Sequence, residues 1–517
     1  MRHSHRLIRN ALANTIGQGA RLLAGFVLPP FVVTRIGRDG YGLVVMLASV
    51  LQFVALVQLG TPQAMNRFVS RELALEQRER LGRVLSSGLL LLVGAAGVAA
   101  VLLLGVVLAP ELALAPPDGM SREVLRWLVV TMGVVAVTGI PLSVGHVAFY
   151  ATERFALLNG IQVAGTVGRI VLVVGLLTVF PASILAYAAG DALAALATAL
   201  ATCIVGVRLL PGANWGLGHA DGATARRIAG YGTEVFLNTL VFLLFLQADY
   251  FLIGKTIGPE AVTLFYLAAI WGLLARSVVG SAMSVVLPTA AGRDAVGDRN
   301  ALRILLVRST KYALLVGLAP VLFLCAFRLR VVSAWMGDGY ETTAALMLPL
   351  LVADLLTLGT AGANDVFTGL GRVRVFTLTS LAAGGVNIVA VVVLTGVLGH
   401  GLEAVAWTYF AVFLVRSAIV LPWWTSRELG MSPWRLYRDA YAGPAFSAVV
   451  ALPLLWALAK WVPDAGWAGI LLAGGLFLLG LAPLVYLFGL DAYDRQVFHS
   501  LVRNHAAGGS PGDRNET

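Results

Sequence analysis

Stretches of about 20 apolar residues, the length that a helix needs to cross a bilayer, recur along this chain of 517 residues. With 58% hydrophobic and 12% charged residues, the composition excludes a water-soluble fold, which could not bury so much apolar surface. The expected fold is therefore an all-α polytopic membrane protein. We predict fourteen transmembrane helices, near 11–34, 42–65, 84–109, 125–150, 156–179, 182–207, 231–254, 261–288, 311–335, 343–367, 375–397, 402–424, 441–461 and 466–489.

Basic residues are distributed unevenly between the two sides of these helices. The segments on the side of the two chain ends carry 25 lysines and arginines, and those on the opposite side carry 8. Cytoplasmic loops are enriched in Lys and Arg, so both termini are predicted to be cytoplasmic. The other four basic residues lie inside the expected helices: Arg21, Arg169, Arg276 and Arg416.

Short motifs recur in the same order along the chain. Ile36-Gly37-Arg38-Asp39 and Ile257-Gly258-Pro259-Glu260 each follow a predicted helix, and P-x-A-x-x-R recurs at Pro62 and Pro288. Transporters built from such repeats hold their substrate between two lobes. We therefore predict two pseudo-symmetric six-helix lobes around a central cleft, with further segments, as follows: 1–207 (N-lobe), 208–230 (cytoplasmic linker), 231–424 (C-lobe), 425–489 (two extra helices) and 490–517 (cytoplasmic tail, partly disordered).

Three mid-span arginines are the first candidates for a functional site. A cation at the bilayer centre costs about 2.5–3.5 kcal/mol, so it usually faces partner helices or a water-filled cavity. Arg21, Arg169 and Arg276 are therefore candidates for a cavity that binds an anion. Each has a structural alternative. Arg21 can extend toward the cytoplasm, Arg169 can pair with Asp191, and Arg276 can pair with an acid such as Asp249.

The sequence contains no HExxH, CxxC or Walker motif, which are typical of metal, redox and nucleotide-binding sites, and its one GxSxG match, Gly508–Gly512, lies in the tail predicted to be partly disordered. No loop is large enough for a folded domain outside the membrane. An enzyme is therefore disfavoured, and we expect no cofactor and no metal. The formal charge of +10 is explained by the cytoplasmic loops, so we expect no nucleic-acid partner.

Motifs spread over nearly the whole chain resemble those of a known family. They are Asn14…Gly17…Gly25…Pro29-Pro30…Ile36-Gly37…Tyr41-Gly42, Asp249…Ile257-Gly258…Tyr266, Trp335-Met336-Gly337…Tyr340, Gly369-x-Gly371-Arg372 and Asn387…Gly399-x-Gly401-x-x-Ala404-x-Ala406. In order and spacing they resemble the lipid-linked oligosaccharide (O-antigen/polysaccharide) flippases of the multidrug/oligosaccharidyl-lipid/polysaccharide exporter superfamily. Lipid II flippases of that superfamily carry cavity arginines in the first and eighth helices, which Arg21 and Arg276 match.

The resemblance implies that the chain moves an undecaprenyl-diphosphate-linked oligosaccharide from the cytoplasmic to the outer leaflet of the bacterial plasma membrane, by alternating access. Arginine suits this cargo because its planar fork binds phosphate bidentately and stays charged. Membrane lipid and the polyprenyl-diphosphate-linked glycan are the implied partners, with a polysaccharide polymerase and export machinery as further candidates. The alternatives are a lipid II flippase, a cation-coupled drug antiporter of the same superfamily, which usually has twelve spans and an acidic cleft, and a non-transporting scaffold or atypical polymerase.

Other polar residues within the spans supply further candidates. The carboxylates Asp249 and Asp354 are candidates for ion coupling, although each can equally balance an arginine. Because no nucleotide-binding motif is present, the energy for transport is expected from an ion gradient, the membrane potential or removal of cargo. The candidates for glycan contacts are amide and indole side chains of the first, second, seventh and eighth helices: Asn14, Gln18, Gln52, Gln58, Asn238, Gln247 and Trp271.

Overall fold

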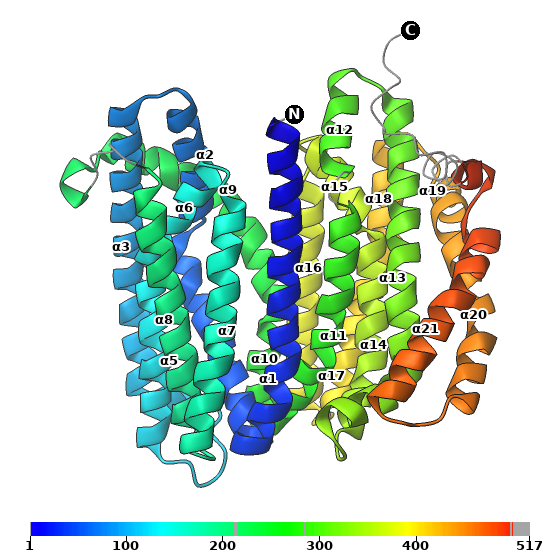
Figure 1. The fold of residues 1–517 in the computed structure, drawn as a ribbon, viewed down its shortest axis with the longest axis horizontal. Coiled ribbons are helices and arrows are strands. Elements are labelled where there is room, and N and C mark those ends of the chain that lie inside the picture. Colours follow the sequence, from blue (N-terminus) through cyan, green and yellow to red (C-terminus); the bar gives the residue numbers. More distant parts are fainter. Residues whose placement is uncertain (1, 211–215, 284–285, 497–498, 500–517) are drawn as a thin grey trace. The chain divides into compact units, whose positions relative to one another are not determined.

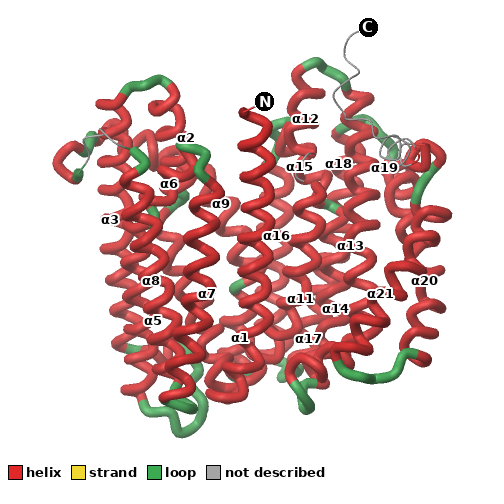
Figure 2. The backbone as a smooth tube through the Cα atoms, viewed as in Figure 1, coloured by secondary structure: helices red, strands yellow, loops and turns green. Residues whose placement is uncertain are grey.

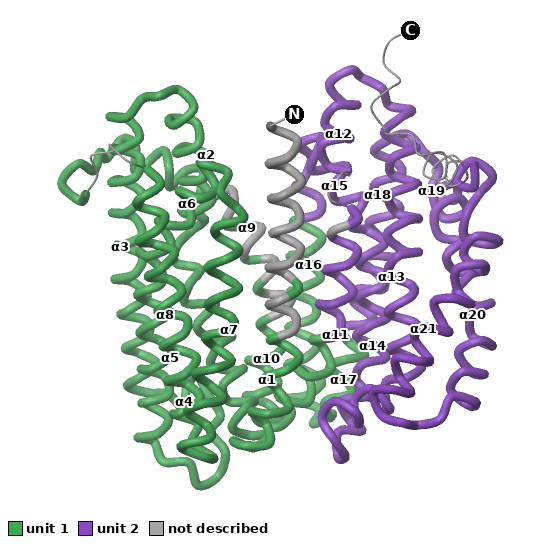
Figure 3. The backbone as a smooth tube through the Cα atoms, viewed as in Figure 1, with its two compact units in different colours: residues 1–270, 377–408 green, residues 271–376, 409–517 purple. Residues whose placement is uncertain are grey.

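The computed structural model describes residues 2–210, 216–283, 286–496 and 499. All regular secondary structure in these residues is helical, and the helices are joined by short loops (Figure 2). The all-α prediction is therefore confirmed. The chain forms two compact units (Figure 3): unit 1 comprises Met1–Ile270 and Thr377–Thr408, and unit 2 comprises Trp271–Phe376 and Tyr409–Thr517.

Unit 1 is built mainly from the first half of the chain (Figure 1). Gly37 interrupts the helical geometry of its first helix, with φ 77° and ψ 168°, a conformation that glycine adopts without a steric penalty. The first helix therefore consists of two helices that meet where the sequence predicts the first outer loop. The helices of unit 1 are α1 (Arg2–Ala55), α2 (Thr61–Ala74), α3 (Arg78–Leu108), α4 (Pro110–Ala113), α5 (Arg122–Leu142), α6 (Val144–Ala151), α7 (Phe155–Val179), α8 (Ile184–Arg208), α9 (Gly222–Leu246) and α10 (Ala248–Thr256).

Three helices belong partly to each unit, because the unit boundaries fall inside them: α11 (Pro259–Met283), α16 (Arg374–Val391) and α17 (Leu402–Leu414). A π-helical turn, Val392–Val397, extends α16, and another, Val415–Val420, joins α17 to α18. The remaining helices form unit 2: α12 (Val286–Ala295), α13 (Arg299–Met336), α14 (Glu341–Gly359), α15 (Ala361–Gly369), α18 (Leu421–Glu428), α19 (Pro433–Leu436), α20 (Ala442–Trp461) and α21 (Trp467–Leu484).

By length and composition, twelve helical segments of the described chain can cross a membrane, which agrees with a multi-pass membrane protein. One of them, Ala24–Gln58, contains the break at Gly37 and overlaps the first two predicted spans. Helices α9 and α10, over the predicted seventh span, are not among the twelve. The count of fourteen spans therefore stays a prediction, as do the two six-helix lobes and the cytoplasmic termini. The twelve segments are Ala24–Gln58, Arg78–Leu108, Arg122–Leu142, Phe155–Val179, Ile184–Arg208, Pro259–Gly280, Arg299–Met336, Glu341–Gly369, Arg374–Val397, Leu402–Glu428, Pro433–Trp461 and Trp467–Gly489.

Small residues let the helices of unit 1 approach one another closely. A Cβ atom at Gly206 of α8 would lie 2.3 Å from the carbonyl oxygen of Gly145 in α6. A Cβ atom at Gly88 of α3 would lie 2.3 Å from the sulfur of Met65, which is fully buried on α2. Close backbone approach at small residues is the usual way in which membrane helices pack, so these glycines are explained by packing.

The first residues of the predicted cytoplasmic tail form ion pairs with helix α13 of unit 2. The ammonium group of Lys311 on α13 lies 2.9 Å from a carboxylate oxygen of Asp491 and 2.6 Å from one of Asp494. The hydroxyl of Tyr312 donates a hydrogen bond of 2.6 Å to Asp494. The side chains of Lys311 and Asp494 are 5% and 2% exposed, so this is a buried ion pair with its charges satisfied.

Candidate functional site

Arg276 lies in α11 of unit 2 and has two polar partners on other helices. Its Nη2 donates to a carboxylate oxygen of Asp354 on α14, with which it forms an ion pair, and to the hydroxyl of Tyr409 on α17 at 3.3 Å. The Asp354 side chain is 4% exposed, whereas that of Arg276 is 30% exposed. The acid is therefore enclosed, while part of the Arg276 side chain stays exposed.

Gly272 makes this pairing sterically feasible. It lies one helical turn before Arg276 on α11, and a Cβ atom there would lie 1.7 Å from Oδ2 of Asp354. Any side chain at this position would displace the carboxylate, because contacts below 3.0 Å are not found at real Cβ atoms. The sequence of α11 thus provides both the cation and the space that its partner needs.

A similar group of three side chains is present in unit 1. Nε of Arg169 on α7 lies 2.5 Å from Oδ1 of Asp191 on α8, and Nη2 of Arg169 donates to the Tyr187 hydroxyl at 3.3 Å. Tyr187 and Asp191 are four residues apart and therefore share one face of α8. Gly190 lets α8 approach α7 closely, because a Cβ atom there would lie 3.0 Å from the backbone of Val173 on α7. The predicted partnership of Arg169 with Asp191 is confirmed.

The ion pairs with Asp354 and Asp191 occupy only some of the hydrogen-bond donors of Arg276 and Arg169. The partner of Arg276 is Asp354, and not Asp249, which belongs to unit 1. A guanidinium has five N–H donors in a planar fork, and the contacts described above occupy only part of them. The Arg169 side chain is 42% exposed and that of Arg276 is 30% exposed, so both side chains stay partly accessible. An anion could therefore bind to either residue without separating it from its carboxylate.

Asp249 on α10 has a different environment. It is 2% exposed, and its Oδ1 accepts a hydrogen bond of 2.8 Å from Nδ2 of Asn387 on α16. Within the described residues, its Oδ2 has no hydrogen-bond partner and no lysine or arginine forms an ion pair with it. A buried carboxylate without a cation is costly, so Asp249 has an unsatisfied demand for a proton or a cation.

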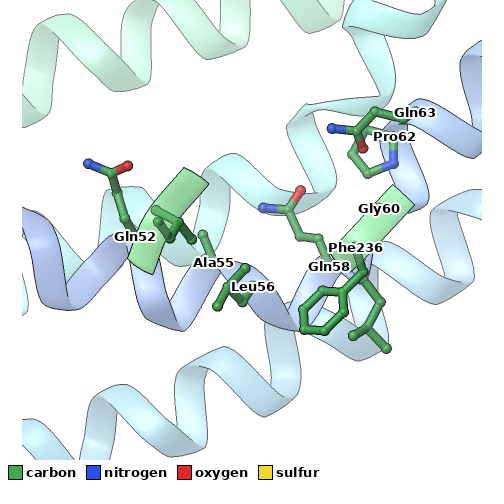
Figure 4. A pocket seen from close by; sticks show the side chains of 10 residues that line it. Gln52, Ala55, Leu56, Gln58, Gly60, Pro62, Gln63 and Phe236 are labelled. Atoms are coloured by element: carbon green, nitrogen blue, oxygen red, sulfur yellow. The ribbon is translucent and has the colours of Figure 1, made fainter. Parts of the chain in front are cut away.

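A cavity of about 250 Å³ lies in unit 1 at the junction of α1 and α2 (Figure 4). Leu59 and Gly60 adopt positive φ angles of 46° and 70°, which end one helix and start the next. The cavity is lined by three glutamines and seven other residues: Gln52, Ala55, Leu56, Gln58, Leu59, Gly60, Pro62, Gln63, Phe236 and Leu243. Amide groups both donate and accept hydrogen bonds, so the three glutamines add hydrogen-bonding groups to an otherwise apolar wall.

The other predicted site residues have varied positions. The side chains of Asn14, Gln18, Arg21 and Asn238 lie outside the part of the chain that the structure describes. Gln247 is half-buried between α9 and α10 and does not line the glutamine cavity. Trp271 is buried and contacts Trp335 edge to face, with ring centroids 5.2 Å apart, so its role in unit 2 includes packing.

Four polar residues of these sites were not among the predicted site residues: Tyr187, Gln63, Tyr409 and Asn387. Asn387 does lie in one of the motifs that resemble the family. The sequence has a usable signal for Tyr187, because this residue lies one helical turn before Asp191 and therefore shares its helix face. Gln63 also had one, since it lies in the repeated Pro62-Gln63-Ala64 motif, two residues after the turn at Gly60. Tyr409 had none, because its contact with Arg276 joins residues 133 positions apart in the chain.

Comparison with known proteins places the chain in a family. The model of the family described as "Polysaccharide biosynthesis protein" matches residues 7–292, which is more than half of the chain. The chain belongs to this family. It is also similar to the membrane protein EpsK of Bacillus subtilis (strain 168), with 22% identity over 479 residues that cover 91% of this chain and 93% of EpsK.

Solved structures similar to this family member share its fold at low sequence identity. The lipid II flippase MurJ in an inward closed conformation is 12% identical, with a TM-score of 0.68 over 93% of this chain and 99% of MurJ. An inward-facing multidrug resistance MATE family transporter of the MOP superfamily is 14% identical, with a TM-score of 0.65 over 84% of this chain and 99% of that one. The fold is therefore that of MOP superfamily transporters, and the predicted resemblance is confirmed.

Proposed function

We propose that this family member is a flippase that moves undecaprenyl-diphosphate-linked oligosaccharide from the cytoplasmic to the outer leaflet by alternating access. The observation that carries the proposal is the glutamine-bearing cavity at the end of Ala24–Gln58, a segment long and apolar enough to cross a membrane. A hydrated glycan does not cross hydrocarbon unaided, because its hydroxyl groups would lose their hydrogen bonds to water. Gln52, Gln58 and Gln63 supply replacement partners along its path.

The diphosphate of this cargo requires cationic donors as well. Arg276 is suited to this role, because Asp354 and Tyr409 hold its guanidinium in place while 30% of its side chain stays exposed. Charge-assisted bonds from arginine to phosphate are short, strong and often bidentate. We assign diphosphate binding to Arg276, with Arg21 and Arg169 as further contacts, and in this assignment Asp354 orients the arginine.

Ion coupling in this proposal is assigned to Asp249. Its carboxylate is buried and has only Asn387 as a hydrogen-bond partner among the described residues, whereas Asp354 is balanced by Arg276. An intramembrane acid without a cationic partner is the usual signature of a proton or cation site. The coupling ion would neutralise Asp249 during part of the transport cycle.

Two other cargoes fit the same fold. MurJ is described as a lipid II flippase and the MATE proteins as multidrug transporters. The family model and the row of amides favour a glycan-bearing lipid over a drug, because a drug offers few hydroxyl groups to three glutamines. Lipid II carries both a diphosphate and sugars, so it is the second candidate cargo.

The glutamine cavity provides a direct test. In proteoliposomes, the triple variant Gln52→Ala, Gln58→Ala, Gln63→Ala is expected to raise the apparent KM for a labelled lipid-linked oligosaccharide by about ten- to two-thousandfold. This range follows from about 0.5–1.5 kcal/mol for each hydrogen bond lost. Gln247→Ala is the matched control, since this glutamine belongs to unit 1 but does not line the cavity. Equal KM values for the triple variant, the control and the native protein would refute a glycan role for the cavity.

A further inference from the structure

A second, strongly basic pocket of about 270 Å³ lies in unit 1, on the side of the membrane predicted to be cytoplasmic. It is formed by the end of α2, the start of α3 and the first turns of α9. Helices α2 and α3 follow one another in the chain, whereas α9 is distant in sequence from both, so the fold brings α9 to the pocket. Its lining residues are Arg71, Glu72, Arg80, Arg83, Val84, Thr224 and Arg227.

The pocket has a buried floor and an accessible cationic rim. Glu72 and Val84 are 4% and 2% exposed, whereas all four arginines are exposed at the surface. The lining therefore contains four positive charges and one negative charge. Among the described residues, neither Arg71 nor Arg80 forms an ion pair, so their guanidinium groups are available to a ligand.

Two acidic residues next to this rim, Glu79 and Asp221, are already occupied. Glu79 pairs with Arg83 at 3.1 Å, and its side chain is 88% exposed. Asp221 caps α9 and accepts hydrogen bonds from the backbone N–H and the hydroxyl of Thr224, at 2.8 and 2.6 Å. These hydrogen bonds to Thr224 lower the pKa of Asp221, so it stays charged and keeps its capping role.

Packing holds one of the arginines in position. The guanidinium of Arg227 lies over the ring of Phe68 on α2, 5.0 Å from its centroid. A cation held over an aromatic ring loses less conformational freedom when it binds a ligand. Since α2, α3 and α9 also pack against one another, the rim is preorganised on rigid helices.

We propose that this pocket binds a phosphate-bearing anion, either a soluble phosphate compound or the head group of an anionic lipid. Guanidinium groups bind phosphate oxygens bidentately. The general excess of basic residues in cytoplasmic loops does not require that four arginines line one pocket. The pocket shares no residue with the glutamine cavity or with the group around Arg276, so the proposal does not depend on the proposed cargo.

The test uses the full chain in nanodiscs of phosphatidylcholine, with inorganic diphosphate as the soluble probe and calorimetry as the readout. Arg71→Gln, Arg80→Gln and Arg227→Gln are each expected to weaken binding by about tenfold, the loss of one charge-assisted hydrogen bond. Binding should also weaken as salt is raised from 0.01 to 0.1 M, because screening shortens the Debye length from about 30 to about 10 Å. Arg78→Gln on α3 and Arg226→Gln on α9 are matched controls, because both arginines are exposed neighbours that do not line the pocket.

A second arm identifies the source of the phosphate. The same variants in nanodiscs that contain phosphatidylglycerol are analysed by native mass spectrometry for retained anionic lipid. Diphosphate binding that is lost in the pocket variants and kept in the controls supports a soluble ligand. Selective lipid retention with the same pattern, without diphosphate binding, supports a head group. Absence of both, or equal binding by pocket variants and controls, overturns the proposal.

Discussion

Arg276→Ala is expected to abolish transport of the lipid-linked oligosaccharide. The substitution removes the guanidinium that we assign to the diphosphate, and loss of two or three charge-assisted bonds at about 1.5–3 kcal/mol each lowers the rate by at least about a hundredfold. Arg276→Lys should restore only part of the rate, because an ammonium group lacks the bidentate geometry of the fork. The measurement is the initial transport rate per folded protein in proteoliposomes.

The buried partner of Arg276 requires a control for folding. Arg276→Ala alone leaves Asp354 enclosed and uncompensated, and removal of one member of a buried pair costs about 3–5 kcal/mol. The double variant Arg276→Ala, Asp354→Asn removes that penalty and should regain normal thermal stability while staying inactive. Recovery of transport by the double variant would show that the pair is structural and that Arg276 does not bind cargo.

Lys311→Met is expected to cause a large loss of stability in unit 2. It leaves the buried Asp494 and the neighbouring Asp491 without their cation, which costs about 3–5 kcal/mol. A decrease in Tm by several degrees in detergent would report this loss. Lys311→Met with Asp494→Asn should recover most of it, and Arg299→Met, on the same helix without a described ion pair, is the control. An unchanged Tm in Lys311→Met would contradict the role of this contact.

The same contact gives unit 2 a dependence on acidity. Burial alone would raise the pKa of Asp491, but the N–H of Asp494 and the ammonium of Lys311 outweigh it and lower that pKa. Because the folded-state pKa is below the unfolded value, about 3.9, the stabilisation is fully present above that value. It is lost as the pH falls through the lowered pKa, and Lys311→Met should remove this part of the acid sensitivity.

The helices were predictable from the sequence because membrane spans are signalled by local hydropathy alone. The break at Gly37 and the pair of Arg169 with Asp191 were also predictable, since both depend on residues close in the chain or on adjacent helices. The partner of Arg276 was not, because α11 and α14 are separated by the long helix α13. Arg276 pairs with Asp354 and not with Asp249 because of tertiary packing and the space left by Gly272.

The cavities were the least predictable features. Gln52 and Gln58 were recognised as polar residues in a span, but their common wall with Gln63 depends on the turn at Leu59 and Gly60. The sequence shows an excess of basic residues on the predicted cytoplasmic side, but it does not show which of these arginines line a common pocket. Hydropathy is the same for scattered arginines and for arginines that meet in the fold. Positions on three helices become neighbours only after folding, and no spacing rule in the sequence encodes that.

The most direct test of the central claim is transport by the purified protein in proteoliposomes with an imposed membrane potential. The substrate is fluorescent undecaprenyl-diphosphate oligosaccharide, and its arrival in the opposite leaflet is measured by chemical quenching. A potential of 100 mV is worth about 2.3 kcal/mol for each elementary charge moved, and the diphosphate carries about two negative charges. The account predicts transport well above that of protein-free liposomes, faster when the receiving side is positive and lost in Arg276→Ala. Transport of a cationic drug, with no movement of the labelled lipid at any potential, would contradict it.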